Sequence, residues 1–142
     1  MQPTVVQRGV IVADDSPIIR SNVRGALGEP WHVFLANDGA EAVEFARDVS
    51  AELVLLDFRM PRLDGLEACA LIRNLPNYAT VPIVLLTAYD STELRRHAAH
   101  AGATTVFGKP FSIDVLREAV LPLIALGRDA AASRRQSMLP DT

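Results

Sequence analysis

Five polar residues follow the short apolar runs of this sequence, and their chemical types suit phosphoryl transfer. Asp14 and Asp15 end the first run, Asp57 the third, Thr87 the fourth and Lys109 the fifth. Clustered carboxylates repel one another unless a cation compensates their charge. A few oxygen donors of this kind suit Mg²⁺, which keeps waters and shares its shell with phosphate oxygens. Because a carboxylate can also attack phosphorus, the set predicts a metal-assisted phosphoryl acceptor.

The elements that must position these residues follow from the apolar pattern, in which short continuous runs alternate with segments of helical period. This pattern is typical of a parallel sheet covered by helices on both faces. We expect five strands, at residues 10–13, 33–36, 53–56, 83–86 and 105–107, alternating with five helices. Ligands of an open α/β sheet bind outside the carboxyl ends of its strands. The five polar residues are therefore expected to converge at one edge of the sheet.

Capping residues indicate where the helices begin and end. Starts are expected at Ser16 with Pro17, Asp38, Asp64, Asp90 or Ser91, and Ser112. Ends are expected at Gly28, Gly102 and Gly127. From Gly127 the sequence loses its apolar period, so residues 127–142 are predicted to be a polar, flexible tail whose arginines are solvated, after a domain of residues 1–126.

The composition fits one soluble domain in a reducing cytoplasm. The chain has 142 residues, 49% hydrophobic and 22% charged, with a net charge of −3. A single cysteine, Cys69, excludes an intramolecular disulfide framework and a multi-cysteine zinc site. We find no apolar segment long enough for a signal peptide or a membrane span. The acidic balance argues against direct binding of nucleic acid.

At the polar residues the sequence resembles the receiver domains of two-component response regulators, over about residues 9–126. The matching pieces are Asp14-Asp15, the segment 57–65 (DFRMPRLDG), Thr87-Ala88 and Lys109-Pro110-Phe111. Each piece alone is weak, but together they are specific in order and spacing. The resemblance implies a flavodoxin-like, doubly wound α/β fold, with five parallel strands in the order 2-1-3-4-5 and five flanking helices.

The resemblance also implies a role for each site residue. Asp57 would be the phosphoacceptor and would bind Mg²⁺ together with Asp15, while Asp14 would reach the ion largely through water. The backbone carbonyl of Arg59 would be a further metal ligand.

Two further residues would contact the phosphoryl group. Thr87 and Lys109 would touch its oxygens, and the Lys109-Pro110 bond is expected to be cis, as is usual in the family.

The implied function is that of a stand-alone response regulator. A histidine kinase or a histidine phosphotransfer protein would donate the phosphoryl group, docking near Pro17 and Ile18 or Ile19. The protein would be no enzyme beyond gaining and losing its own phosphoryl group. It would signal by contact with a downstream protein, or by a phosphorylation-dependent dimer, through the last two helices and the fifth strand.

Three positions bear on how this receiver would work. Where the family carries a switch aromatic, this sequence has Val106, and Phe107 should face the other side of the sheet because strand side chains alternate. We therefore expect activation to move the loop after Thr87 without an aromatic flip. Arg59 and Tyr89 should hang over the pocket and shield the phosphate from water.

Other functions stay open. The chain could be a receiver-like interaction module that is never phosphorylated, or the receiver fragment of a longer regulator. A phosphohydrolase with an aspartyl nucleophile ranks last, because such enzymes usually carry a second aspartate where this sequence has Arg59. His32, His97 and His100 do not lie at the carboxyl end of a strand, so we exclude them from the site.

Overall fold

The structure, a computed structural model, describes residues 9–27 and 31–137. Its elements are β1 (Gly9–Ala13), α1 (Pro17–Leu27), β2 (His32–Ala36), α2 (Gly39–Asp48), β3 (Ala51–Asp57), α3 (Gly65–Arg73), β4 (Ile83–Thr87), α4 (Thr92–Ala101), β5 (Thr105–Gly108) and α5 (Ile113–Ser137). All strands pair in parallel, in the order β2-β1-β3-β4-β5. The predicted flavodoxin-like fold is confirmed.

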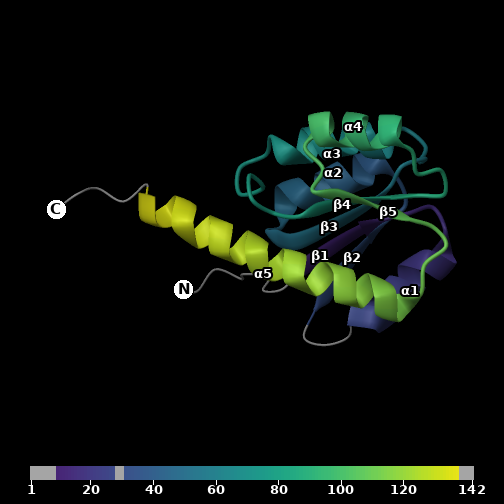
Figure 1. The fold of residues 1–142 in the computed structure, drawn as a ribbon, viewed down its shortest axis with the longest axis horizontal. Helices are drawn as coiled ribbons and strands as arrows, with labels where there is room; N and C mark the ends of the chain where they lie inside the picture. Colours follow the sequence, from purple (N-terminus) through teal and green to yellow (C-terminus); the bar gives the residue numbers. More distant parts are fainter. Residues whose placement is uncertain (1–8, 28–30, 138–142) are drawn as a thin grey trace.

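The helices form a layer on each face of the sheet (Figure 1). Helices α1 and α5 cover one face, and α2, α3 and α4 cover the other. The strand side chains alternate accordingly: Ile11 of β1 packs toward α2 to α4, whereas Val10 and Val12 pack toward α1 and α5. Because both faces are covered, β1, β3 and β4 are buried along their lengths, apart from the half-buried Glu52 of β3. This explains their almost uninterrupted apolar sequences.

Capping residues of the predicted kind bound α2, α3 and α4. Asp38, Asp64 and Ser91 each accept a backbone N–H of the following helix, and Asp64 forms a reciprocal capping box with Glu67. Gly102 ends α4 in the left-handed conformation, with φ of 98°. The predicted end at Gly28 lies outside the described residues.

The prediction that the last helix ends at Gly127 and that a flexible tail follows is wrong for residues 127–137, since α5 continues to Ser137. Gly127 allows α5 to pack closely against the segment before β4. A Cβ at this position would lie 2.9 Å from Cδ of Pro82 and 3.0 Å from the carbonyl oxygen of Thr80. The following Arg128 forms an ion pair with Glu52. These contacts fix the helix to the body of the protein.

Arg128 also corrects the prediction that the arginines after residue 126 are merely solvated. Its guanidinium carbon lies 5.8 Å from the ring centroid of Trp31. This distance permits a cation–π contact, so Arg128 binds an acid and an aromatic ring at once.

Tyr78 joins the α3–β4 connection to the start of β3. Its side chain is 1% exposed, and its hydroxyl donates to the carbonyl of Val49 at 2.6 Å and accepts the N–H of Ala51 at 3.2 Å. Tyr78→Phe leaves two backbone groups without this partner, so we expect the free energy of unfolding to fall by about 1–3 kcal/mol. Urea denaturation measures the change. Tyr89→Phe, at a 71% exposed position, is the matched control, and equal effects of the two substitutions would contradict the assignment.

Candidate functional site

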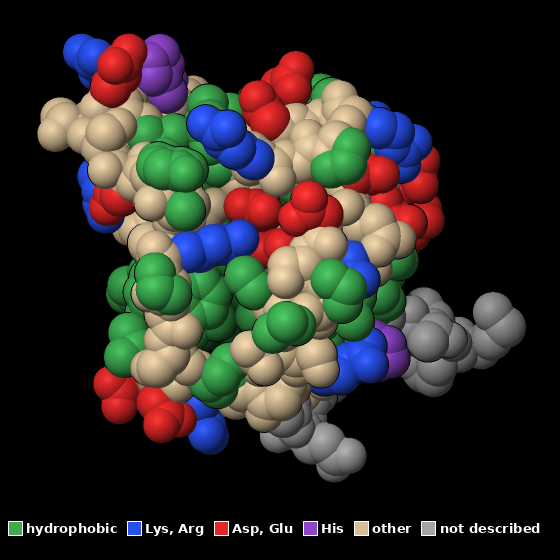
Figure 2. Space-filling model, turned by 90° about the vertical axis from the view of Figure 1, so that its right-hand side faces the viewer, with side chains coloured by type: hydrophobic (Ala, Val, Ile, Leu, Met, Phe, Trp, Pro, Cys, Tyr) green, Lys and Arg blue, Asp and Glu red, His purple; other side chains and the backbone are tan. Residues whose placement is uncertain are grey.

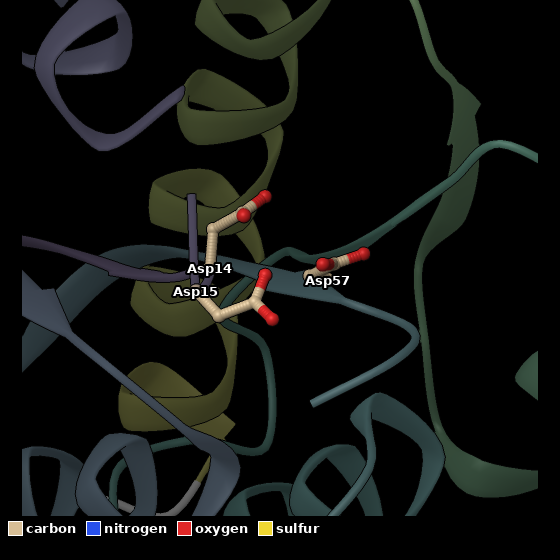
Figure 3. Close-up of side chains that lie close together, drawn as sticks. All are labelled: Asp14, Asp15 and Asp57. Atoms are coloured by element: carbon tan, nitrogen blue, oxygen red, sulfur yellow. The ribbon is translucent and has the colours of Figure 1, made fainter. Parts of the chain in front are cut away.

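Three aspartates meet at the carboxyl edge of the sheet. Asp14 and Asp15 follow β1, and Asp57 ends β3 (Figure 3). One carboxylate oxygen from each lies within 4.8 Å of the others. Asp14 is fully buried and Asp57 is 8% exposed, whereas Asp15 is exposed. Acidic side chains gather at the centre of this face, beside a basic one (Figure 2). The cluster is therefore open to a ligand from one side.

Local hydrogen bonds fix the turn that carries the acidic pair. The N–H of Asp14 donates to the carbonyl of Ala36 at 3.2 Å, and one of its carboxylate oxygens accepts the N–H of Ser16 at 2.8 Å. Arg20 of α1 donates to the backbone carbonyl of Asp14 at 3.0 Å and to the side-chain oxygen of Asn37 at 2.6 Å. Arg20 thus ties the ends of β1 and β2 together, a contact that sequence reasoning missed.

Lys109, the only lysine in the sequence, supplies the positive charge. Its Nζ lies 2.9 Å from Oδ2 of Asp14 and 3.2 Å from Oδ1 of Asp57. Its backbone N–H donates to the carbonyl of Thr87 at 2.7 Å, and the bond to Pro110 is cis, as predicted. The ammonium group therefore bridges two carboxylates that would otherwise repel each other.

Burial and charge shift the ionisation of this pair. Burial first, and then the charge of Asp14, raises the pKa of Asp57 above its usual value, although Lys109 opposes the shift. Burial lowers the pKa of Lys109, but the hydrogen bond and charges from Asp14 and Asp57 outweigh it, so that the pKa is raised. The lysine therefore stays charged, while the carboxylate of Asp57 holds a proton more readily than an ordinary aspartate does.

Thr87 ends β4 beside this cluster and is 2% exposed. Its hydroxyl oxygen accepts the N–H of Tyr89 at 3.0 Å, which makes a tight turn after the strand. Since Leu86 is the register partner of Asp57, Thr87 lies one residue beyond it at the same edge. All five residues predicted from the strand ends are thus located at this edge of the sheet.

Arg59 and Tyr89 both lie exposed in the loops that follow β3 and β4. The guanidinium carbon of Arg59 is 5.4 Å from the ring centroid of Tyr89. This cation–π contact joins the two loops. Sequence reasoning placed each residue near the site, but not their contact with each other.

Val106 and Phe107 face opposite sides of the sheet, as the alternation predicts. Val106 is 5% exposed and packs toward α2 to α4. Phe107 packs on the α1 and α5 side, with its ring centroid 5.3 Å from that of Phe111. No aromatic side chain therefore occupies the usual switch position.

The loop after Asp57 is anchored by a pair that the sequence did not reveal. Arg62, with φ of 68°, donates two hydrogen bonds to Asp38, at 2.9 and 3.0 Å. This contact lowers the pKa of Asp38. Gly65 lets the loop close tightly, because a Cβ there would lie 2.5 Å from the carbonyl oxygen of Asp57. Asp38-Gly39 and Asp64-Gly65 stand at the starts of α2 and α3, and this repeated Asp-Gly pair is a signal from which the close packing could have been predicted.

The donor set fits a hard divalent cation. Three carboxylates supply oxygen ligands, the type that Mg²⁺ prefers, and they come from two rigid strand ends. Lys109 neutralises only part of their charge, since its one ammonium group pairs with Asp14 and Asp57 and leaves Asp15 of the cluster without it. The residues present therefore fit a magnesium site.

Comparison with known proteins decides the family. The response regulator receiver domain model matches residues 10–121. The chain belongs to the response regulator receiver family. This receiver is 36% identical over 129 residues to the transcriptional regulatory protein PdtaR of Mycobacterium tuberculosis, a match that covers 89% of this chain and 62% of PdtaR.

Solved structures agree with this assignment. The chemotaxis protein CheY4 of Vibrio cholerae superposes with a TM-score of 0.78 at 30% identity, covering 82% of this receiver and 98% of CheY4. The receiver domain of the sensor histidine kinase PA1611 of Pseudomonas aeruginosa gives 0.73 at 30% identity, covering 83% and 98% of the two chains, and is described with magnesium coordinated in its active-site cleft.

Two facts bear on the wider context. The chain spans 46% to 62% of the length of the curated relatives it matches. Among the described residues, no helix is both long and apolar enough to cross a membrane.

Proposed function

We propose that this receiver accepts a phosphoryl group on Asp57 from a histidine kinase or a histidine phosphotransfer protein. The observation that carries the proposal is the position of the Lys109 ammonium group, within 3.2 Å of Asp57 and 2.9 Å of Asp14, inside a cluster of three carboxylates. Such a cluster is costly for the fold without a ligand that uses it. A phosphoryl group with Mg²⁺ matches both its negative and its positive groups.

In the proposed reaction, a carboxylate oxygen of Asp57 attacks the phosphorus of the donor. A new oxygen–phosphorus bond forms while the bond from phosphorus to the leaving nitrogen breaks, and that nitrogen keeps the electron pair. Lys109 and the hydroxyl of Thr87 stabilise the charge that develops on the phosphoryl oxygens. Because attack needs the ionised carboxylate, protonation of Asp57 should slow phosphorylation as the pH falls.

Bound Mg²⁺ would supply further neutralisation of the phosphoryl oxygens. Asp15 and Asp57 would hold it directly, Asp14 largely through water, and the backbone carbonyl of Arg59 would complete the protein's share. The PA1611 receiver, which is described with magnesium in its cleft, supports this proposal.

The proposal includes how the signal enters and leaves. Ile18 is 71% exposed at the start of α1 and gives the phosphodonor an apolar docking contact. The downstream protein, or a second copy of the receiver after phosphorylation, would bind at α4, β5 and α5. The domain would act in the cytoplasm without direct contact to nucleic acid, either alone or joined to an output region, and would catalyse only its own phosphorylation and dephosphorylation.

Intact-mass spectrometry tests the proposal. The protein is incubated with Mg²⁺ and acetyl phosphate, and we expect the mass of one added phosphoryl group, which is lost in Asp57→Ala and when the metal is removed with EDTA. The absence of an adduct with acetyl phosphate and with a phosphorylated histidine kinase would instead favour an interaction module that is never phosphorylated.

The contact between Arg59 and Tyr89 predicts a long-lived phosphate. If the two side chains shield the pocket together, replacing both by alanine should accelerate dephosphorylation by about fivefold, equivalent to about 1 kcal/mol of barrier. Loss of the phosphorylated mass over time gives the rate. Arg96→Ala, which removes an exposed arginine of α4, serves as the control. An unchanged rate in the double variant would refute the shield.

A further inference from the structure

A groove lies at the edge of the sheet opposite to the acidic cluster. It runs between the C-terminal part of α5 and the connections that lead into β3 and β4, and it has a volume of about 600 Å³. Figure 1 shows this part of α5 extending past the sheet. We define the α5 groove by Asn77, Thr80, Pro82, Ile124, Arg134 and Arg135, six of the residues that line it. None of them takes part in the phosphorylation site.

The α5 groove has an apolar floor. Pro82 is buried and Ile124 is 2% exposed, and both line the groove together with Ala131 of the helix. Gly127 also lines the groove, and its lack of a side chain lets α5 approach Thr80 and Pro82. The groove can therefore bury an apolar side chain of a ligand.

The rim of the groove is positively charged, although the chain as a whole has a net charge of −3. Arg128 at one end is engaged by Glu52. The salt bridges within residues 9–27 and 31–137 do not include Arg134 or Arg135, and both arginines are exposed. Two guanidinium groups thus face the groove without a carboxylate partner among those residues.

We propose that the α5 groove binds an acidic segment of a partner protein. Carboxylates of the segment would pair with Arg134 and Arg135, whose planar guanidinium groups match carboxylates with two parallel hydrogen bonds. An apolar side chain between those carboxylates would pack on Val81 and Ala131, which line the groove and are only half-buried. Nucleic acid fits less well, because the described residues that line the groove include no aromatic one and the chain is acidic overall.

A simpler role for the two arginines is to stabilise the end of α5, since cations in the last turn of a helix interact favourably with its dipole. If this were their only role, replacing the two arginines would change the helix content slightly, and no acidic peptide would bind to the groove. The two explanations therefore differ in whether an acidic peptide binds.

The test uses the full chain and a fluorescent peptide in which glutamate and leucine alternate, with a glutamine-for-glutamate peptide as the reference. Fluorescence anisotropy should detect binding of the acidic peptide and not of the reference. The double variant Arg134→Glu, Arg135→Glu should weaken binding at least about tenfold, because two charge-assisted contacts are lost. The matched control Arg96→Glu, Arg117→Glu changes the net charge equally at exposed positions outside the groove and should bind as the wild type does.

Three results would overturn the proposal: no binding of the acidic peptide, equal losses in the two double variants, or displacement of the peptide by a single-stranded RNA of similar length. Circular dichroism checks that the helix persists. If the charge reversals unfold it, Ala131→Phe offers a second test, since it should block the groove sterically without a change in charge. Binding is expected to be unaffected in Asp57→Ala, so this inference and the proposed phosphorylation can fail separately.

Discussion

Lys109→Met is expected to slow phosphorylation by acetyl phosphate about 100-fold or more, the usual effect of removing a group that stabilises transition-state charge. Methionine keeps the length of the side chain but leaves Asp14 and Asp57 without the ammonium group that now lies 2.9 and 3.2 Å away. For the same reason, Mg²⁺ should bind more tightly to this variant, because a competing cation has been removed. The rates follow from intact-mass time courses, and the metal affinities from calorimetry.

The opposite directions of these two effects separate a catalytic role from damage to the fold. A misfolded site would lose both Mg²⁺ binding and phosphorylation. Arg96→Met removes a cation from the exposed face of α4 and should change neither. Phosphorylation of the Lys109 variant at the wild-type rate would contradict the role assigned to the lysine.

Asp57→Asn is expected to stabilise the metal-free protein at neutral pH while abolishing phosphoryl uptake. The pKa of Asp57 is raised by burial and by Asp14, so folding favours the protonated form. The stability that comes from this preference is fully present below the pKa that Asp57 has in the unfolded chain. It is lost as the pH rises through the higher pKa that Asp57 has in the folded protein. At neutral pH the wild type carries this penalty and the variant does not. We therefore expect the Tm of the variant to be higher than that of the wild type.

Low pH should remove this difference in stability, and Mg²⁺ should reduce it. As the pH falls through the raised pKa, Asp57 becomes protonated, so the wild type should approach the stability of the variant. With Mg²⁺ in excess the wild type should gain more, because binding to the folded state adds to its stability. Asp48→Asn, at an exposed position, is the control. If Asp57→Asn lowered the Tm at neutral pH without metal, the assigned burial and repulsion would be wrong.

The fold was predictable because its determinants are local. Each strand is a short apolar run, and Asp38, Asp64 and Ser91 cap the helices that follow them. The end of α5 was not predictable, since glycine followed by polar residues is the usual signal for a helix stop. Here tertiary contacts of Gly127 and Arg128 override that signal.

The candidate site was likewise predictable only in part. Its residue types were predictable from the polar residues at the end of each apolar run, because the carboxyl ends of parallel strands meet at one edge. The supporting contacts were not, because they join residues far apart in sequence: Arg20 with Asn37, and Arg62 with Asp38. The sequence pattern also could not show that Lys109 would approach Asp14 more closely than Asp57.

Borohydride reduction of the phosphorylated protein tests the central claim most directly. Borohydride converts an aspartyl phosphate to homoserine and leaves free carboxylates unchanged, so peptide mass spectrometry identifies the residue that carried the phosphoryl group. We expect homoserine at position 57 alone, and only after incubation with Mg²⁺ and a phosphodonor. Homoserine at Asp14 or Asp15, or a phosphorylated protein that yields none, would contradict the assignment of Asp57 as the phosphoacceptor.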